Sequence, residues 1–178
     1  MKLIALILAT IFVSCVSIPK GLKAVKSIDL EKYLGRWYEI VRLDHSFERD
    51  LSNVTADYSL KEDGGIKVLN KGYDLKSNKW KNAEGVAYFI DDENREGRLK
   101  VSFFRPFYGG YNIILLDDGY EWSVVAGPDF TYLWILSRTP SMDKTLLKDL
   151  VSRLKIMGFD TEKFIYVDQS KYLADSKL

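Results

Sequence analysis

Cysteine and histidine are almost absent from this 178-residue chain, which holds one of each, Cys15 and His45. A single cysteine cannot form a disulfide within the chain. A zinc site built from the usual three or four His and Cys ligands is also excluded by count. We therefore expect no bound metal and no cofactor, and we expect stability to rest on a hydrophobic core.

The chain also has no large excess of positive or negative charge, since 26 Lys and Arg residues stand against 25 Asp and Glu residues. Binding to nucleic acid needs a strong basic excess that neutralises phosphates, so nucleic acid is not expected as a partner. Apolar residues make up 47% of the chain and aromatic residues 13%. This composition predicts one globular domain with a sizeable core and enough aromatic side chains to line a large apolar surface.

The apolar run from Leu3 to Val13 is shorter than the about 20 residues that a membrane-spanning helix needs. It follows Lys2 and leads to Ser14 and Cys15, an order that indicates a cleaved secretory signal. The segment resembles the bacterial lipoprotein signal, in which cleavage precedes a cysteine that receives the lipid. An ordinary signal peptide with an incidental cysteine is the alternative.

This resemblance implies a signal peptide at residues 1–14, lipid attachment at Cys15, and a membrane partner reached through the lipid anchor. Because Val16, and not Asp, follows the cysteine, it implies the outer membrane. Residues 15–28 show neither helical nor strand periodicity and are predicted to form a tether. The domain would then span residues 29–170, and the tail, residues 171–178, is predicted to be disordered.

Short alternating runs separated by turn residues follow Gly35, a pattern typical of an all-β barrel or sandwich. The eight expected strands cover residues 36–43, 54–60, 66–73, 83–89, 98–104, 111–116, 122–126 and 132–137. Apolar residues at helical spacing between Leu146 and Met157, ended by Gly158, predict a helix packed outside the sheet. A last short strand is expected at residues 164–167. Eight strands joined by short hairpins can close into an antiparallel up-and-down β-barrel just wide enough for one small ligand.

The stretch GRWYEI places Trp37 at the start of the first strand. In an up-and-down barrel this strand begins at the end where the eighth strand finishes, so Trp37 and Arg138 are predicted to be neighbours. A guanidinium over an indole face is a favourable stack. The turn that holds Asp117 and Tyr120 falls at the same end, which we expect these side chains to close as a floor.

Gly35, Trp37 and Arg138, with LDDGY at residues 116–120, resemble the three conserved blocks of the lipocalin family. The wider stretches GRWYEI, NKGY, VSFFRPFYGGYN and YLWILSRTP are similar to the bacterial outer-membrane lipocalins of the apolipoprotein D-like branch. The resemblance implies a protein, not an enzyme, that binds fatty acids, lysophospholipids or similar amphiphiles and stores or transports them, for membrane maintenance. It implies a structural role for Gly35, Trp37, Asp117, Tyr120 and Arg138.

Successive side chains of a strand point to opposite faces of the sheet, and this alternation, here called strand parity, predicts which side chains line the cavity. The expected lining residues are Ala56, Tyr58, Val68, Ala87, Phe89, Val101, Phe103, Val124 and Trp134. The mouth would be framed by the loops at residues 44–53, 74–79, 105–110 and 127–131. The expected rim residues are His45, Phe47, Arg105 and Tyr108. Glu39 shares the parity of Trp37 and should point inward, which requires either a buried partner or an irregular strand.

Three other function classes stay open. A haem or tetrapyrrole carrier would use His45 as an axial ligand. An envelope interaction protein would have a barrel filled by large side chains, and the stretch PFY at residues 106–108 could serve a partner or a homodimer. An enzyme is the least favoured, because the single His lies in a loop and no G-x-S-x-G motif is present.

Overall fold

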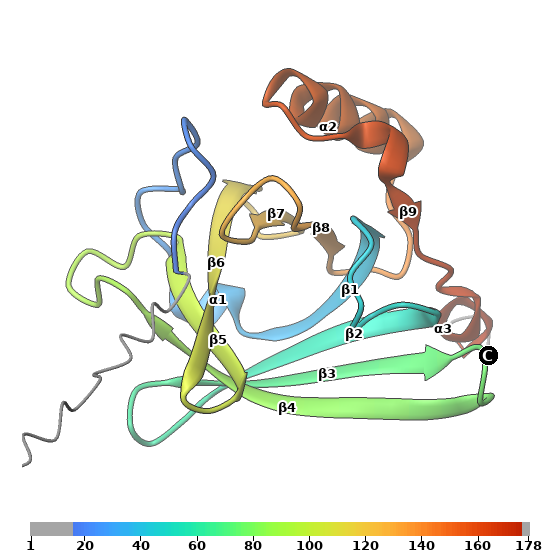
Figure 1. The fold of residues 1–178 in the computed structure, drawn as a ribbon, viewed down its shortest axis with the longest axis horizontal. Coiled ribbons are helices and arrows are strands. Elements are labelled where there is room, and N and C mark those ends of the chain that lie inside the picture. The colour runs from blue at the N-terminus through green and yellow to red at the C-terminus, as the bar shows by residue number, and fades with distance from the viewer. Residues whose placement is uncertain (1–15, 176–178) are drawn as a thin grey trace, which may run out of the picture.

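The computed structural model describes residues 16–175 and shows a sheet rolled into a barrel, with a long helix outside it (Figure 1). Neighbouring strands are antiparallel in the order β2-β3-β4-β5-β6-β7-β8-β1-β9, and a further pairing of β1 with β2 closes the barrel. The strands are β1 (Gly35–Arg42), β2 (Leu51–Leu60), β3 (Ile66–Asp74), β4 (Lys79–Phe89), β5 (Arg98–Phe104), β6 (Phe107–Leu116), β7 (Trp122–Ala126), β8 (Leu133–Ser137) and β9 (Ile165–Tyr166). The predicted eight-stranded up-and-down barrel is confirmed, with β9 added to β1.

The hairpin between β5 and β6 is tighter than the sequence indicated. In place of a loop over residues 105–110, β6 already begins at Phe107, which pairs with Phe104. Glycine is common in turns, but Gly110 lies within β6. Its lack of a side chain makes room for the N-terminal segment. A Cβ at Gly110 would lie 2.7 Å from the carbonyl oxygen of Ser17. Strands β2 and β4 likewise begin earlier than predicted.

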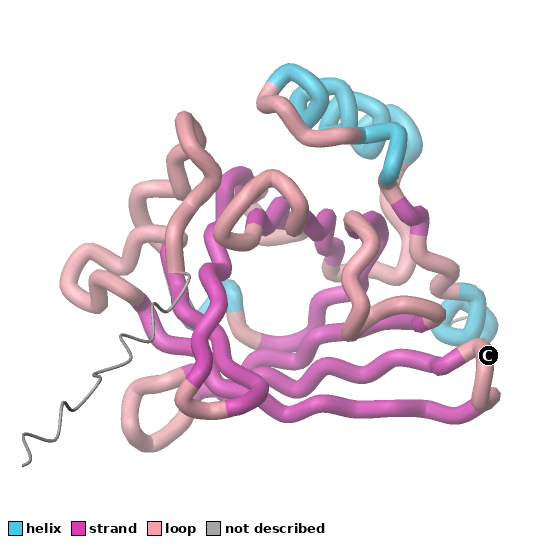
Figure 2. Tube along the Cα trace, viewed as in Figure 1, coloured by secondary structure: helices cyan, strands magenta, loops and turns pink. Residues whose placement is uncertain are grey.

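Helix α2 (Lys144–Ile156) lies against the outside of the barrel, as its apolar stripe predicts (Figure 2). Its N-cap is Asp143, whose carboxylate accepts hydrogen bonds of 2.9 Å from two backbone amides of the first turn. Leu150 and Leu154 are fully buried in an apolar cluster that includes outward-facing side chains of β7 and β8. The helix therefore covers the outer face of this part of the barrel and leaves the interior free.

Residues 16–28, predicted to form a tether, are held against the barrel. The Ser17 hydroxyl donates a hydrogen bond of 3.0 Å to the Pro128 carbonyl. The Val25 amide and carbonyl are hydrogen bonded to β6 and to the residue before β5, at 2.9 and 2.8 Å. The short helix α1 (Leu30–Tyr33) follows, which the sequence analysis did not predict. The segment lacks periodicity because it packs along the barrel without joining the sheet.

Strands β1 and β2 separate as they approach the mouth of the barrel. Their pairing ends at Tyr38 and Thr55. Beyond this point the side-chain amide of Gln169 lies between them and donates hydrogen bonds of 2.8 Å to the carbonyls of Glu39 and Val54. A residue from the C-terminal part of the chain thus replaces the missing strand pairing.

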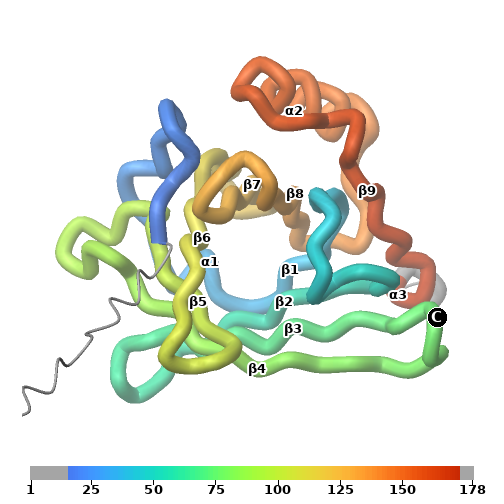
Figure 3. Tube along the Cα trace, in the orientation of Figure 1, coloured from blue at the N-terminus to red at the C-terminus, as the bar shows by residue number. Residues whose placement is uncertain are grey.

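The tail that was predicted to be disordered contains the helix α3 (Ser170–Asp175), which lies beside the beginning of β2 (Figure 3). The ring of Tyr172 lies 5.2 Å from that of Tyr38 and 5.7 Å from that of Trp80. The prediction was wrong as far as residue 175, because contacts with the barrel order a segment that has little helical pattern of its own.

Candidate functional site: a cavity with a tyrosine base and an acidic wall

The closed end of the barrel is sealed by Trp37, which is fully buried. The guanidinium carbon of Arg138 lies 3.7 Å from the centroid of the indole ring, the neighbour relation that the strand order predicts. The same guanidinium donates hydrogen bonds to the backbone carbonyls of Arg36, Tyr120 and Lys32. Arg138 therefore joins three segments of the chain at the floor.

Gly35, Asp117 and Tyr120 shape the same end. Gly35 has a φ of +91°, a left-handed conformation that favours glycine. The Asp117 carboxylate accepts hydrogen bonds from two amides of its own turn, at 2.9 and 3.2 Å. The Tyr120 hydroxyl accepts one of 2.8 Å from the Asp29 amide. None of these side chains lines the cavity, a placement that agrees with the structural role implied for them.

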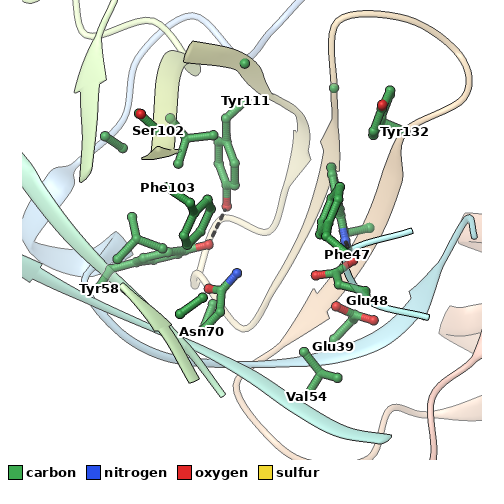
Figure 4. Close-up of a pocket in the computed structure, with 18 of the residues that line it drawn as sticks. Glu39, Phe47, Glu48, Val54, Tyr58, Asn70, Ser102, Phe103, Tyr111 and Tyr132 are labelled. Carbon is green, nitrogen blue, oxygen red and sulfur yellow. Dashed lines mark hydrogen bonds between the residues drawn. The ribbon is translucent and has the colours of Figure 1, made fainter. Parts of the chain in front are cut away.

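Three tyrosine hydroxyls meet above the floor. The Tyr111 hydroxyl lies 2.8 Å from that of Tyr33. It lies 3.0 Å from that of Tyr58 (Figure 4). Burial raises the pKa of Tyr33 to about 12 and raises the pKa of Tyr58 and of Tyr111 well above the ordinary tyrosine value. All three hydroxyls stay protonated at neutral pH and bond to one another, so the base of the cavity is uncharged.

The barrel encloses a cavity of about 850 Å³, a volume typical of small-molecule sites. Its walls are mostly apolar and aromatic. Seven of the nine predicted lining residues contribute to it: Ala56, Tyr58, Val68, Ala87, Val101, Phe103 and Trp134. Strand parity was correct for these positions because side chains alternate between the two faces of a strand.

Two predicted lining residues do not reach the cavity. Val124 is fully buried on the outer face of β7, in the cluster with α2. Its neighbour Val125 points inward instead, since it pairs with the inward-facing Trp134 across β7 and β8. The sequence WSVVA has too little alternation to show this, and an error of one residue reverses a strand. Phe89 packs against the inner core at the closed-end terminus of β4, away from the cavity.

The predicted rim residues divide into two groups. Phe47 and Tyr108 line the mouth, and Phe47 is 62% exposed. Arg105 does not line the cavity: at the tip of the β5–β6 hairpin, its guanidinium lies 3.4 Å from the hydroxyl of Tyr88. The expected contact between Arg105 and a head group is therefore not supported, because the tight hairpin turns its side chain away from the opening.

His45, expected at the rim, is buried behind the cavity wall. Its ring stacks on Tyr132 at 4.6 Å and on Phe47 at 5.3 Å between centroids, and lies 4.9 Å from Trp134. Burial, together with the charge of Arg42, lowers the pKa of His45 to about 4, so the imidazole is neutral at pH 7. Since His45 does not line the cavity, the haem alternative loses the axial ligand on which it depended.

An acidic wall formed by Glu39, Arg42 and Glu48 lies on one side of the cavity. The Arg42 guanidinium donates to a Glu39 carboxylate oxygen at 2.7 Å and to the Glu48 backbone carbonyl at 2.9 Å. The Trp134 indole N–H donates to the Glu48 carboxylate at 2.9 Å. Glu39 thus has a buried partner, and strand β1 is also irregular, with a register shift between Glu39 and Val41. Strand parity pointed to Glu39, but no pattern marked Glu48, which lies in a loop.

The two carboxyl groups of this wall hold protons more tightly than exposed ones. Burial raises the pKa of Glu39 to about 8, an effect that the charge of Glu48 increases and that of Arg42 opposes. Burial also raises the pKa of Glu48, although the hydrogen bond from Trp134 and the charge of Arg42 lower it in part. Full ionisation of the pair is therefore disfavoured in the free protein.

Within residues 16–175, no group of three or more His, Cys, Asp or Glu side chains is placed to hold a metal ion. No helix in the same range is long and apolar enough to cross a membrane. Cys15, the predicted site of lipid attachment, lies outside the described residues, and so does the predicted signal peptide.

Comparison with known proteins identifies the family. The model of the lipocalin-like domain matches residues 28–169. The chain belongs to the lipocalin family. The outer membrane lipoprotein Blc of Vibrio cholerae is 48% identical over 95% of this chain and 99% of that protein. The protein of the same name in Escherichia coli is 51% identical over 85% of each, and mouse apolipoprotein D is 30% identical over 82% of this lipocalin and 79% of that protein.

Solved structures of other lipocalin barrels support the fold. Insecticyanin from Manduca sexta superimposes with a TM-score of 0.68 at 20% identity, covering 85% of this lipocalin and 86% of that chain. The cockroach allergen Per a 4 gives a TM-score of 0.66 at 24% identity, covering 86% and 95%. At such identities the likeness concerns the fold alone.

Family membership sets the general activity of this lipocalin, and its bacterial relatives indicate its location. Lipocalins bind small hydrophobic ligands, and none of the relatives above has an enzyme name. The bacterial relatives at 48–51% identity are outer membrane lipoproteins, and this lipocalin is likewise a lipid-anchored protein of the outer membrane. Attachment through Cys15 itself stays a prediction.

Proposed function

We propose that this lipocalin binds fatty acids, lysophospholipids or similar amphiphiles and stores or transports them at the cell envelope for membrane maintenance. The observation that carries the proposal is the cavity of about 850 Å³ with apolar walls and an open mouth. Such a cup suits a molecule with one apolar tail and one polar head. A barrel of this volume speaks against an interaction protein whose core is filled by its own side chains.

The path of the N-terminal segment supports a role in lipid exchange. Ser17 is bonded to Pro128, which lines the cavity at its mouth, so the chain toward Cys15 leaves the barrel at this end. A lipid on Cys15 would bring the mouth toward the membrane. Phe104 and Phe107 lie at the tip of the hairpin beside the mouth and are 77% and 54% exposed, which suits contact with lipid.

Native mass spectrometry followed by lipid extraction tests the proposal. The mature chain with Cys15→Ala, which keeps every described residue, would be purified from its own host envelope without detergent. We expect an adduct with the mass of a fatty acid or lysophospholipid. Ala83→Trp, which places an indole in the cavity, should carry much less of this adduct while showing the same circular dichroism spectrum.

A reproducibly empty barrel in both proteins would contradict the proposal. Acquisition of a Soret band on titration with haem would instead favour the tetrapyrrole alternative. Light scattering of the same samples tests whether the chain forms a homodimer, which stays a prediction.

A further inference from the structure

We propose that Glu39, Glu48, Phe47, Tyr132 and Trp134 form a subsite for a cationic nitrogen, an ammonium or trimethylammonium group, in the head of the bound amphiphile. This inference rests on the proposed function and names the head-group chemistry of its ligand. We call these five residues the cation subsite. All of them line the cavity.

The carboxyl groups of the cation subsite are buried in the protein wall yet directed into the cavity. Glu39 and Glu48 are only 3% and 6% exposed, and their carboxyl groups lie close together at the cavity surface (Figure 4). Each has one oxygen bonded to the protein, Glu39 to Arg42 and Glu48 to Trp134. A buried charge is stabilised only when it is paired, so this wall favours a positive partner.

The charges around the subsite do not balance when both carboxyl groups are ionised. Arg42 is the cation bonded within the wall, and its second nitrogen is used by the carbonyls of Glu48 and Leu51. His45 is buried and neutral behind the wall. Two carboxylates and one guanidinium leave one negative charge, so burial disfavours full ionisation in the free protein and a bound ligand cation would favour it.

The other basic side chains that line the cavity are engaged elsewhere. Arg49 is paired with Asp44 at 2.5 Å, and Lys81 is paired with Asp74. The Lys71 ammonium lies over the Trp80 ring, 4.4 Å from its centroid. An anionic head group beside Glu39 and Glu48 would therefore lack a basic partner on the cavity wall and would face two carboxyl groups.

Aromatic rings complete the subsite. The Tyr132 and Trp134 rings lie 6.3 Å apart, and His45 stacks on both Tyr132 and Phe47, which holds the three cavity-lining rings in place. Faces of aromatic rings attract ammonium and trimethylammonium groups, most strongly where water is excluded. Carboxyl groups and rings on one wall of a cavity with otherwise mostly apolar walls and an uncharged base fit a cationic head and an apolar tail.

Three dodecyl ligands of matched chain length test the inference. The mature chain with Cys15→Ala would be loaded with N-phenylnaphthylamine, a neutral fluorescent probe, and titrated below micelle concentrations. The ligands are dodecyltrimethylammonium, dodecanoate and the neutral dodecanol. We expect dodecyltrimethylammonium to displace the probe at about ten-fold lower concentration than dodecanoate.

Two substitutions locate the effect. Glu48→Gln keeps an acceptor for Trp134 and should abolish most of the preference for the cation, and Glu39→Gln should act in the same direction. Affinity for dodecanol should change less than two-fold in both variants, which shows that the cavity is intact. Glu62→Gln, an exposed position in the turn between β2 and β3, is the matched control and should leave all three affinities unchanged.

Dodecanoate that binds as tightly as dodecyltrimethylammonium would overturn the inference, and so would a cation preference that survives both substitutions. In either case displacement by dodecanol would leave the proposed function standing. If dodecanol and both charged ligands fail to displace the probe, the proposed lipid-binding function itself is wrong.

Discussion

Trp37 shows how a single side chain can be essential to the fold and remote from the ligand. Its indole N–H donates to the Tyr33 carbonyl at 2.9 Å, its face carries Arg138, and its ring lies 5.0 Å from that of Tyr33. It is absent from the cavity lining. Stability and binding should therefore respond differently to its removal.

We expect Trp37→Ala to lower the free energy of unfolding by about 3–5 kcal/mol, because it leaves a void and exposes the Arg138 charge to an apolar floor. Ligand affinity per folded molecule should change little. Urea unfolding and probe titration measure the two quantities. Trp80→Ala, at a position 41% exposed, is the control and should cost much less. Unchanged stability with lost binding would contradict the assigned role.

The raised pKa of Glu39 leads to a prediction of how the stability of the protein depends on pH. Its pKa rises from an ordinary value near 4.5 to about 8 on folding, so the folded state holds a proton that the unfolded state releases. Stability should therefore fall as pH rises toward 8. His45 has the opposite effect: because folding lowers its pKa to about 4, it makes stability increase as pH rises from about 4 to 6.5. Above pH 6.5 it no longer changes the dependence of stability on pH.

Between pH 6.5 and 8, the wild type should lose about 1–2 kcal/mol of unfolding free energy through Glu39. Glu39→Gln should show a flatter profile over the same range. Urea unfolding at several pH values makes the comparison, and Glu62→Gln should follow the wild type. Equal slopes in wild type and Glu39→Gln would show that Glu39 is ionised in the folded protein.

At the scale of elements, the gap between β1 and β2 is the feature that places the acidic wall. The pairing of β1 with β2 ends at Tyr38 and Thr55, and beyond it the Gln169 side chain donates hydrogen bonds to the carbonyls of Glu39 and Val54. The amides of Asn53 and Val167 are bonded nearby, to Asp168 and Ile40. This region is held by few strand pairings and should be a site of local opening.

Gln169→Met keeps the volume of the side chain and removes its donor. We expect it to cost about 1–3 kcal/mol, because two buried carbonyls lose their partner. Hydrogen exchange should speed up about ten-fold or more at Asn53 and Val167, whereas amides between β3 and β4 should be unaffected. Lys171→Ala, at the exposed neighbouring position in α3, is the control. Uniform acceleration across the barrel would instead indicate global destabilisation.

At the scale of the whole molecule, the closed floor, the open mouth and the N-terminal segment share one axis. The segment from residue 16 runs from the mouth at Pro128 to α1 at the floor. Because Cys15 precedes the described barrel, anchoring and ligand binding should be separable properties of one chain.

Cys15→Ala should move the protein from the membrane fraction to the soluble periplasmic fraction, because it removes the predicted site of the lipid anchor. Probe affinity should not change, since Cys15 precedes the described barrel. Fractionation with immunodetection and a probe titration make the two measurements. Persistence of the Cys15→Ala variant in salt-washed membranes would show that attachment does not depend on this cysteine.

Local sequence pattern was enough to predict the barrel, its external helix and its floor. Alternation along β5 and the stripe of α2 are properties of neighbouring residues, and the meeting of Trp37 with Arg138 follows from strand order alone. These features need no knowledge of distant contacts. The same holds for most of the lining, including Tyr58 and Phe103.

Only the tertiary structure decided the chemistry of the cavity wall. Glu48 and His45 lie in a loop without periodicity, and their burial depends on Tyr132 and Trp134, almost 90 residues away in the chain. Val124 faces outward because the pairing of β7 with β8 sets which side chains of β7 point inward. The β7 sequence has no alternation that would indicate this orientation. Contacts between distant segments set the burial, partners and charge of these groups, and no local pattern encodes such contacts.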